Sequence, residues 1–525
     1  MKIIIAGSGP AGVFAATGAL GPDVEILMID PGLELPDDPK ARAAELAALP
    51  PERWREPDLA FIKGAMDTTP SGIAEKTLYG SDFASRSLPC FPTRFENAHV
   101  YISHARGGLS NIWGRGVEPL PRADRAAWPF IDDLEQSYRE VLEALPFVAG
   151  DDNLAEVLPL YTTRFRTPPL SSQFETLHRR LRKHERRLNA QGIHFGQSRF
   201  LIEFAEDDAH ACRFCNLCMY GCAYGAMYST HQTLAVLEQS PNFEYRGGLA
   251  LESFVDEGQR VTLQVIDVAS GERSELVADK LVIAAGAVNT TRIVMRALGA
   301  SEASLKTSDM IQIPLLALRG RRRILDERTY SLAQLTLAIR DPAVARQAII
   351  VHLFGFNPIF LDAVRSLLPR WAYRLLEIPI HGLLARVFIA SSLVGSQQSA
   401  RLALELDDGT LKVRGHAHPD AKRVARRLAW KLSKSALRTG LLPLPFLTST
   451  KLPGGSVHCG ASLPVDGSGP LSTRADGALS TCPNVYIADS SALPDVPAGS
   501  FTLTIMANAH RIGRGLRRTA RGPGD

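Results

Sequence analysis

The opening stretch of the chain, a strand followed by a glycine-rich turn and a helix, constrains the fold most. Residues 3–6, which follow Lys2, are a run of small and branched apolar residues, typical of a buried parallel strand. Gly7, Gly9 and Gly12 follow at the spacing G-x-G-x-x-G, and an alanine-rich helix is expected to follow. In such a turn the glycines permit a tight bend, a close approach to a pyrophosphate and helix–strand packing, and the helix N-terminus offers N–H groups to the phosphates. The stretch therefore predicts an α/β fold with a dinucleotide site.

An acidic residue ends the second apolar run of this unit. Residues 24–29 are apolar apart from Glu25, and Asp30 follows them. An acid about 20 residues after such a turn can accept a hydrogen bond from a ribose hydroxyl. The strand, the glycines, the helix and Asp30 occur together, which favours a dinucleotide site over an unrelated glycine-rich turn. The pattern is compatible with either NAD or FAD.

The size and charge of the chain limit its class. A chain of 525 residues is too long for one hydrophobic core and suggests two closely joined domains. Lysine and arginine total 59 against 55 acidic residues, and the net charge of +4 is far too small to indicate a nucleic-acid partner. The first strand begins at residue 2, which leaves no room for a signal peptide, and no run reaches the about 18 apolar residues of a membrane span. We therefore expect a cytoplasmic protein.

A second glycine-rich loop follows the first hundred residues. A short strand leads into it, and the loop carries Gly107, Gly108, Ser110 and Asn111 between two arginines. One interpretation is a tight structural turn. The other interpretation, which the number of glycines favours, is a second close approach of the backbone to the dinucleotide.

The later part of the chain alternates between strand and helix patterns. A β-rich section from about 250 ends in a buried strand at 280–284, which could pair with the first strand. From about 301 to 450 the chain is rich in leucine, proline and arginine, with alternating strands and basic helices, and this character indicates a separate sheet-based domain. A buried strand at 484–489 and a helix from about Thr502 complete the chain.

These features, in this order, resemble the glucose–methanol–choline (GMC) family of flavoprotein oxidoreductases. The matching stretches are residues 7–12 with Asp30, 107–111, 281–290, 457–460, 484–489 and 502–506. The resemblance implies FAD rather than NAD, a Rossmann-like FAD-binding domain that is discontinuous in sequence, and an α+β substrate domain built on an antiparallel sheet. The implied boundaries are 1–130, 200–300 and 450–525 for the FAD-binding domain, 131–199 for a helical cap segment, and 301–449 for the substrate domain.

The resemblance also implies a set of cofactor contacts. The implied FAD-binding residues are Gly7, Gly9, Gly12, Asp30, Gly107, Gly108, Ser110, Asn111, Gly286, Asp489 and Thr502. In the family, the loop like 107–111 packs against the flavin, and the strand end at Asp489 with the following helix lies near the ribityl chain and the pyrimidine ring. The N-terminus of that helix would favour the negative charge of a reduced flavin.

His458 is the candidate catalytic base. It follows a glycine-rich run and aligns with the catalytic histidine of the family. Imidazole suits the removal of a hydroxyl proton because its pKa lies near neutrality. The alternative is a packed loop histidine. Where the family usually places a second Asn or His, this chain has Ser500, a poor base, so either Ser500 only positions the substrate or the reaction is not a simple alcohol oxidation.

Four cysteines form the other distinctive motif. Cys212, Cys215, Cys218 and Cys222 have the spacing of bacterial ferredoxin loops, without the proline that usually follows. They predict an iron-sulfur cluster, with three or four irons (3Fe–4S or 4Fe–4S), such as some GMC-like dehydrogenases carry. The alternatives are buried thiols without metal, a disulfide pair, or a zinc site, which this single crowded loop fits less well.

The sequence thus predicts an FAD-dependent dehydrogenase that oxidises an alcohol group of a sugar-like or bulky apolar substrate. Electrons would leave through the cluster to an external acceptor protein or quinone. A redox-neutral flavoenzyme, such as an isomerase or lyase, is the alternative, and a non-catalytic FAD-binding subunit is a third. Residues 356–394 could contact a membrane surface or line an apolar substrate pocket, although a core-facing helical pair is the favoured interpretation.

Overall fold

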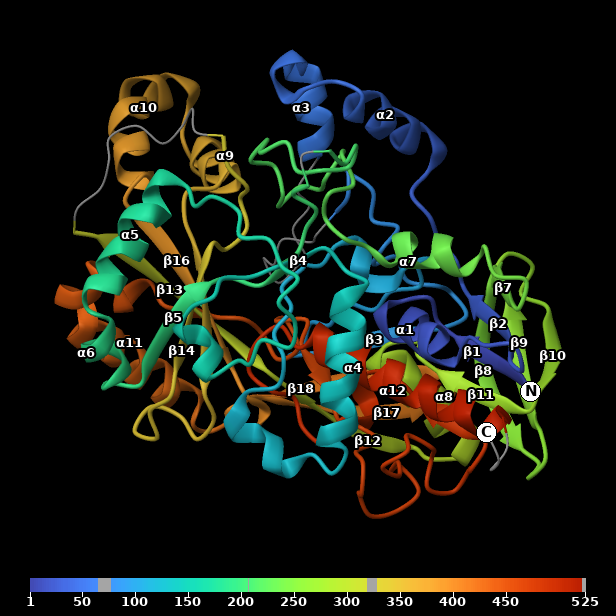
Figure 1. Ribbon diagram of the computed structural model, residues 1–525. Coiled ribbons are helices and arrows are strands. Elements are labelled where there is room, and N and C mark those ends of the chain that lie inside the picture. Colours follow the sequence, from blue (N-terminus) through green and yellow to red (C-terminus); the bar gives the residue numbers. More distant parts are fainter. Residues whose placement is uncertain (65–76, 206, 319–327, 522–525) are drawn as a thin grey trace.

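The fold is mixed α/β, with several sheets, in a computed structural model that describes residues 1–64, 77–205, 207–318 and 328–521 (Figure 1). The helices are α1 (Pro10–Ala19), α2 (Asp37–Ala47), α3 (Glu56–Lys63), α4 (Ile131–Glu143), α5 (Ser172–Lys183), α6 (Glu185–Asn189), α7 (Thr230–Leu237), α8 (Ala287–Leu298), α9 (Pro358–Leu367), α10 (Arg370–Leu384), α11 (Ala421–Thr439) and α12 (Thr502–Arg521).

The strands come from all parts of the chain. They are β1 (Lys2–Ala6), β2 (Glu25–Asp30), β3 (Thr93–Glu96), β4 (Phe147–Val148), β5 (Ile193–Gln197), β6 (Phe200–Leu201), β7 (Phe243–Gly247), β8 (Leu249–Asp256), β9 (Val261–Asp267), β10 (Arg273–Ala278), β11 (Lys280–Ile283), β12 (Glu302–Thr307), β13 (Asp309–Ala317), β14 (Leu335–Ile339), β15 (Ile349–Phe354), β16 (Val387–Val394), β17 (Arg401–Asp407), β18 (Thr410–His416), β19 (Leu441–Pro443), β20 (Ser449–Thr450), β21 (Cys459–Gly460) and β22 (Val485–Ile487).

A parallel sheet with the strand order β22-β11-β1-β2-β7 receives the glycine turn. Every neighbouring pair in it is parallel, and β1 lies between β2 and β11. The predicted pairing of the strand at 280–284 with the first strand is therefore confirmed. Both faces of such a sheet are covered, which explains why β1 and β11 read as continuous apolar runs. The carboxyl ends of β1, β11 and β22 meet at one edge, although they lie hundreds of residues apart in sequence.

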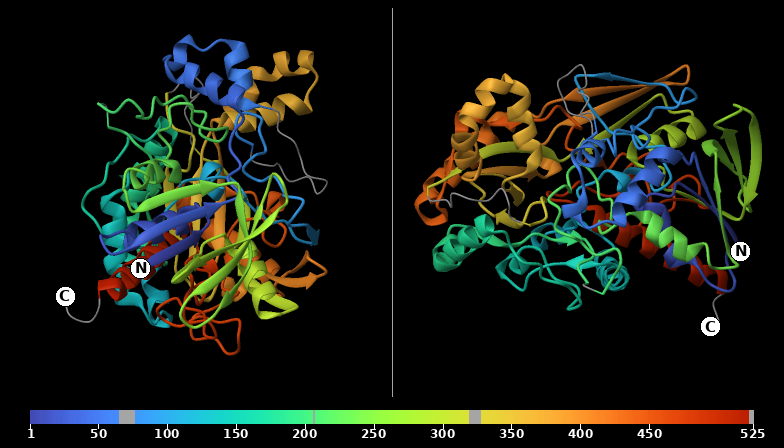
Figure 2. Two further views of the ribbon diagram at one scale, coloured as in Figure 1. Left: turned by 90° about the vertical axis from the view of Figure 1, so that its right-hand side faces the viewer. Right: turned by 90° about the horizontal axis from the view of Figure 1, so that it is seen from above.

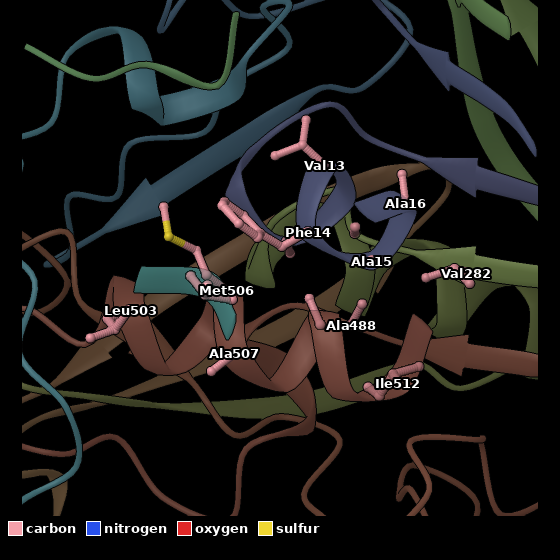
Figure 3. Close-up of a cluster of buried hydrophobic side chains, with 14 of the residues drawn as sticks. Val13, Phe14, Ala15, Ala16, Val282, Ala488, Leu503, Met506, Ala507 and Ile512 are labelled. Carbon is pink, nitrogen blue, oxygen red and sulfur yellow. The ribbon is translucent and has the colours of Figure 1, made fainter. Parts of the chain in front are cut away.

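Helices α1 and α12 cover one face of this sheet. Figure 3 shows the two helices packed together, with Phe14 of α1 and Met506 of α12 among the side chains between them. The three-stranded antiparallel sheet β10-β9-β8 packs on the other face through Leu263 and Ile283, among others. The final helix of the chain is thus as much a part of this unit as the first.

A seven-stranded sheet stands beside the parallel one (Figures 1 and 2). Its strands follow the order β19-β13-β16-β15-β14-β5, with β20 paired to β13, and every pairing is antiparallel, as expected for the second sheet. One face packs on α5 and α11, for example through Leu353 and Leu428. The segment 131–199 supplies β5 to this sheet and is therefore not helical throughout. The domain boundaries given above stay a prediction.

A second five-stranded sheet, β21-β12-β17-β18-β3, packs against α8, and β4 pairs with β6 in a two-stranded sheet. Its strand β21 follows His458 directly, and β21 pairs with β12. The pairing fixes the position of the histidine loop.

No described helix is long and apolar enough to cross a membrane.

Candidate active site

A cavity of about 670 Å³ lies between the carboxyl edge of the parallel sheet and the seven-stranded sheet. Its walls come from both ends of the chain and from the middle. Of the residues selected from the sequence, those that line it are Gly7, Gly9, Asp30, Gly108, Ser110, Gly286, His458, Asp489, Ser500 and Thr502. Gly12, Gly107 and Asn111 of the predicted FAD-binding set do not line it, and neither do the four clustered cysteines. The volume lies within the range of small-molecule sites, about 300–1,000 Å³.

The glycine turn after β1 is packed too tightly for side chains. Gly7 has φ of +111°, a region that L residues rarely adopt, and a Cβ there would overlap the carbonyl oxygen of Ala284, directly after the neighbouring strand β11. A Cβ on Gly12 would overlap the carbonyl oxygen of Gly7. The first and third glycines of the motif are thus required by the backbone itself. Gly9 faces the cavity instead, opposite Gly108.

Asp30 ties the two glycine-rich loops together. Its Oδ2 accepts hydrogen bonds from Ser8 N at 2.7 Å and Ser8 Oγ at 2.8 Å, and its Oδ1 accepts one from Gly32 N at 2.7 Å. Ser8 Oγ in turn accepts a hydrogen bond from Gly107 N at 2.8 Å. Burial raises the pKa of Asp30 to about 6, while the Ser8 and Gly32 donors act in the opposite direction. The carboxylate therefore organises both loops at the cavity edge.

The side chains of the second loop hold its own shape. Ser110 Oγ donates to Gly107 O at 2.6 Å and accepts from Thr230 N at 3.1 Å. Asn111 Nδ2 donates to Arg106 O at 2.9 Å and to Gly108 O at 2.8 Å. These contacts explain why the loop needs Ser and Asn, and they place the backbone of Gly108, not the Asn111 amide, toward the cavity.

Helices α1, α8 and α12 all begin at the cavity. Their first residues line it, and no side chain caps α1 or α8. Asp489, at the end of β22, joins this region: it accepts from Gly286 N at 2.9 Å and from the Thr290 hydroxyl, and its other oxygen accepts from Ser491 N at 2.9 Å. Uncapped helix N-termini favour anionic ligands. A Cβ on Gly286 would meet no atom within 4 Å, so this glycine leaves open space for a bound group.

His458 reaches the cavity from the loop before β21. Its carbonyl oxygen accepts a hydrogen bond from Ser308 N at 2.9 Å, and its ring lies 5.6 Å from the Phe501 ring, centroid to centroid. Phe501 also lines the cavity, next to Ser500. The structure therefore brings His458 and Ser500 to the same cavity as the glycine turn, and their catalytic roles stay a prediction.

Sequence reasoning missed a second imidazole in the cavity. His352 of β15 lines it, and its Nε2 lies 2.8 Å from Oε1 of Glu118, within hydrogen-bond distance. Glu118 also accepts a hydrogen bond from the backbone N–H of Ser500. Burial alone would raise the pKa of Glu118, but His352, the Ser500 N–H and Arg199 together lower it. Glu118 thus links the predicted Ser500 to an unpredicted histidine.

His104 is another missed residue, at the opposite end of the site. It lines the cavity beside Asn289, and its ring stacks on Phe91 at 5.9 Å. Burial lowers the pKa of His104 to about 4, so the ring is neutral at physiological pH. It sits in the loop that precedes Gly107, but no feature of its sequence surroundings distinguishes it from a packed histidine.

The far wall of the cavity is one face of the seven-stranded sheet. Alternate residues of its strands point inward, because side chains alternate between the two faces of a sheet. The inward-facing residues are Met310, Gln312 and Pro314 of β13, His352 and Phe354 of β15, and Ile389, Ser391 and Leu393 of β16. The wall is predominantly apolar, with a few polar side chains near His352.

The four clustered cysteines do not form a metal site among the described residues. No three His, Cys, Asp or Glu side chains there are arranged to hold a metal ion, and none of the cysteines is in a disulfide. Cys212 and Cys218 pack with apolar residues such as Tyr330, whereas Cys215 packs in a different cluster with Tyr224. The backbone of this loop also bonds to neighbours, for example Cys218 N to Ser331 Oγ at 3.1 Å. The structure therefore does not support the predicted iron-sulfur cluster.

Comparison with protein-family models and with curated proteins finds no match. Among solved structures, the chain is similar to pyridoxine 4-oxidase from Mesorbium loti, with a TM-score of 0.60 and 14% identity over 98% of this chain and 99% of that chain. It is also similar to an FAD-dependent oxidoreductase from Chaetomium thermophilum, with a TM-score of 0.56 and 13% identity over 99% of both chains. Over its whole length the chain therefore has the fold of an FAD-dependent oxidoreductase, and this fold fits the resemblance to the GMC family.

Proposed function

We propose that the chain is an FAD-dependent oxidoreductase of the GMC type that oxidises an alcohol group of a bulky, largely apolar substrate. One observation carries the proposal: His458 and the glycine turn of β1 line the same cavity, whose far wall is apolar. The FAD-binding domain would be Rossmann-like and discontinuous, because the strands of the parallel sheet come from residues 2–30, 243–283 and 485–487.

The residues around the cavity fit FAD. The Gly7–Gly12 turn and the N-terminus of α1 would hold the pyrophosphate, with Asp30 at the ribose end. Gly286 and Thr502, at the starts of α8 and α12, and Asp489, just after β22, would lie along the rest of the cofactor. When bound there, FAD supplies a hydride acceptor for the alcohol carbon.

In this proposal, the chain's own residues handle the proton and the orientation of the substrate. His458 would accept the hydroxyl proton as the carbon is oxidised. Ser500 would donate a hydrogen bond to the substrate oxygen, since its hydroxyl is a poor base. His352, held by Glu118, would present a second polar contact from the sheet wall. The apolar side chains around it would exclude water from the reacting atoms.

The absorption spectrum of the purified protein tests the proposal directly. We expect bound flavin bands, and we expect an alcohol from a panel of aromatic, fatty and glycosidic alcohols to bleach these bands in the absence of oxygen. A larger effect with the aromatic and fatty alcohols than with glycosides would agree with the apolar wall. A protein that stays colourless when supplied with FAD would contradict the proposal.

Asp30→Asn is expected to weaken FAD binding about 10- to 100-fold, the loss of one or two charge-assisted hydrogen bonds. In either orientation the Asn amide NH2 would face the donors of Ser8 or Gly32, so the link from Ser8 to Gly107 would loosen. Titration of FAD into the apoprotein, followed by flavin fluorescence, measures the change. Asp23→Asn, at an exposed position near the same strand, is the matched control and should bind FAD like the wild type.

His352→Leu is expected to lower the rate of flavin reduction about 10- to 100-fold and to raise the substrate KM, while FAD remains bound. The change removes the polar contact in the sheet wall and leaves Glu118 buried without its hydrogen-bond partner on β15. His352→Gln keeps a hydrogen-bond donor, so its substrate KM should lie close to the wild-type value. If the flavin is reduced as fast in both variants as in the wild type, His352 has no part in the reaction.

A redox-neutral reaction is the second candidate, and Ser500 is the observation that favours it. A serine in place of a second base leaves a single imidazole from the predicted set, and an isomerase or lyase on this scaffold needs no net flavin reduction. Substrate conversion without bleaching of the flavin bands would identify this case. An external acceptor protein or quinone for the electrons, and the cytoplasmic location, stay predictions.

Iron analysis of anaerobically purified protein decides the cysteine motif. The geometry of the described residues supplies no ligand set, so the proposal takes no step through Cys212, Cys215, Cys218 and Cys222. Stoichiometric iron with a broad absorption that dithionite bleaches would mean that this loop rearranges around a cluster. Flavin bands without iron would leave the four thiols as packing residues.

A further inference from the structure

The α9–α10 hairpin turns apolar side chains toward solvent. The helical pair expected from the sequence is present, but the expectation that its apolar residues face the core is wrong for α10. Trp371 is 69% exposed, Leu375 76% and Ile378 85%, and Leu367 at the end of α9 is 80% exposed. Such large exposed apolar patches mark interaction surfaces.

These residues form one stripe along the helix. Trp371, Leu375 and Ile378 follow one another at intervals of four and three residues, which places them on the same face of α10. The opposite side carries the buried Tyr373, whose hydroxyl lies 3.0 Å from His381 Nε2. In an ordinary surface helix the apolar stripe faces the core, whereas here it points away from it.

Basic side chains border the stripe. Arg370 and Arg374 are exposed. Their positions on α10 put them along one edge of the stripe, beside Ile378. Long arginine side chains at the edge of an apolar helix face can reach lipid phosphates while the apolar residues enter the interface.

The hairpin is firmly placed next to the cavity. Asp362 of α9 pairs with Lys63 of α3 at 2.7 Å and accepts from Tyr220 Oη at 2.7 Å. Asn357 and Ile359, at the start of α9, line the cavity itself. Figures 1 and 2 show α9 and α10 beside α3 at one end of the molecule.

A second exposed apolar segment lies at the same end of the seven-stranded sheet. Leu442 pairs with Leu316, and Leu316 pairs with Val387, three residues after α10 ends. Phe446 and Leu447, which follow β19, are exposed as well. The apolar surface thus extends beyond a single helix.

We propose that the α10 stripe, defined as Trp371, Leu375 and Ile378, docks the protein on the surface of a lipid bilayer that contains anionic lipids. The stripe would lie in the interface, with Arg370 and Arg374 on the lipid phosphates. No described helix crosses a membrane, so the contact is peripheral. Because the base of the hairpin lines the cavity, docking would bring the cavity close to apolar molecules dissolved in the bilayer. The inference does not depend on which reaction the cavity carries out.

Co-sedimentation of the full chain with vesicles tests the docking. With phosphatidylcholine vesicles that contain about 30% phosphatidylglycerol, we expect the wild type to sediment. The stripe variant, Trp371→Ser with Leu375→Ser and Ile378→Ser, should bind about 100-fold more weakly, since three large apolar side chains are lost. Val255→Ser with Val277→Ser is the control: these exposed valines lie on the β8–β10 sheet, on the opposite side of the molecule in Figure 1, and should leave binding unchanged.

A charge variant and a spectroscopic measurement guard against misfolding. The double variant Arg370→Gln with Arg374→Gln should bind anionic vesicles at least about tenfold more weakly than the wild type. Its binding to pure phosphatidylcholine vesicles should equal that of the wild type. Brominated lipids should quench the fluorescence of the wild type more than that of Trp371→Phe. Wild-type protein that stays in the supernatant, or a stripe variant that sediments like the wild type, would overturn the proposal. The proposal would also be overturned if the wild type is a dimer that does not bind vesicles and the stripe variant is a monomer.

Discussion

Replacing His458 with alanine is expected to slow reduction of the bound flavin by an alcohol about 100- to 10,000-fold, the usual range for losing a positioned base. The residue lines the cavity beside Phe501 and Ser500, and alanine at this position offers no proton acceptor. FAD should stay bound, because the glycine turn expected to hold its pyrophosphate follows β1 in the parallel sheet, whereas His458 precedes β21 in the second five-stranded sheet. Anaerobic stopped-flow absorption at the flavin band, with the best alcohol of the panel, measures the rate.

Cys459→Ala is the matched control for this experiment. Cys459 follows His458 and lines the same cavity, but burial raises the pKa of its thiol to about 12, so it cannot accept a proton near neutral pH. The control should reduce the flavin at close to the wild-type rate. Full reduction by His458→Ala together with a large loss in His352→Leu would move the role of base to His352.

The N-terminal unit could be predicted from the sequence because its signals are local. The turn after β1 needs glycine at positions 7 and 12 for reasons that lie within a few residues or on an adjacent strand. The apolar run at 280–284 predicted a buried parallel strand that could lie beside the first strand, and β11 does pair with β1. Steric contacts between nearby backbone atoms restrict which residue can stand at a position, and the sequence shows this restriction directly.

His352 and Glu118 could not be found in this way. They are 234 positions apart, and only the register of β15 in the seven-stranded sheet turns His352 toward the cavity. A shift of one residue would send the same side chain to the other face of the sheet. Sequence patterns carry no information on such a register when the pairing partners are unknown.

Two other predictions show that one pattern can serve two structures. The cysteine spacing of a ferredoxin loop is also compatible with a packed loop, and here the backbone N–H of Cys218 donates to Ser331 Oγ. The apolar period of α10 predicts a stripe but not what the stripe faces. Packing by the rest of the chain decides both cases.

Gly513→Ala is expected to destabilise the protein by about 3 kcal/mol, at the upper end of overpacking effects. Helices α1 and α12 cross with their backbones in contact. A Cβ on Gly513 would overlap the carbonyl oxygen of Ala15 and lie 2.8 Å from Ala19 N, and a Cβ on Gly18 would overlap the carbonyl oxygen of His510. These neighbours are backbone atoms, so no side-chain rotation can relieve the overlap, and the helices must separate along the cluster of Figure 3.

Gly515→Ala, on the same helix, separates this steric effect from helix propensity. A Cβ there would meet no atom within 4 Å, so the change should stabilise the protein by about 0.5–1 kcal/mol. Urea unfolding followed by far-ultraviolet circular dichroism measures both variants. The Gly513 variant should also hold FAD less tightly, because α12 begins at the cavity with Thr502. Equal stability of the two variants would mean that the helices can part at little cost, and the C-terminal helix would then not be what fixes this side of the cavity.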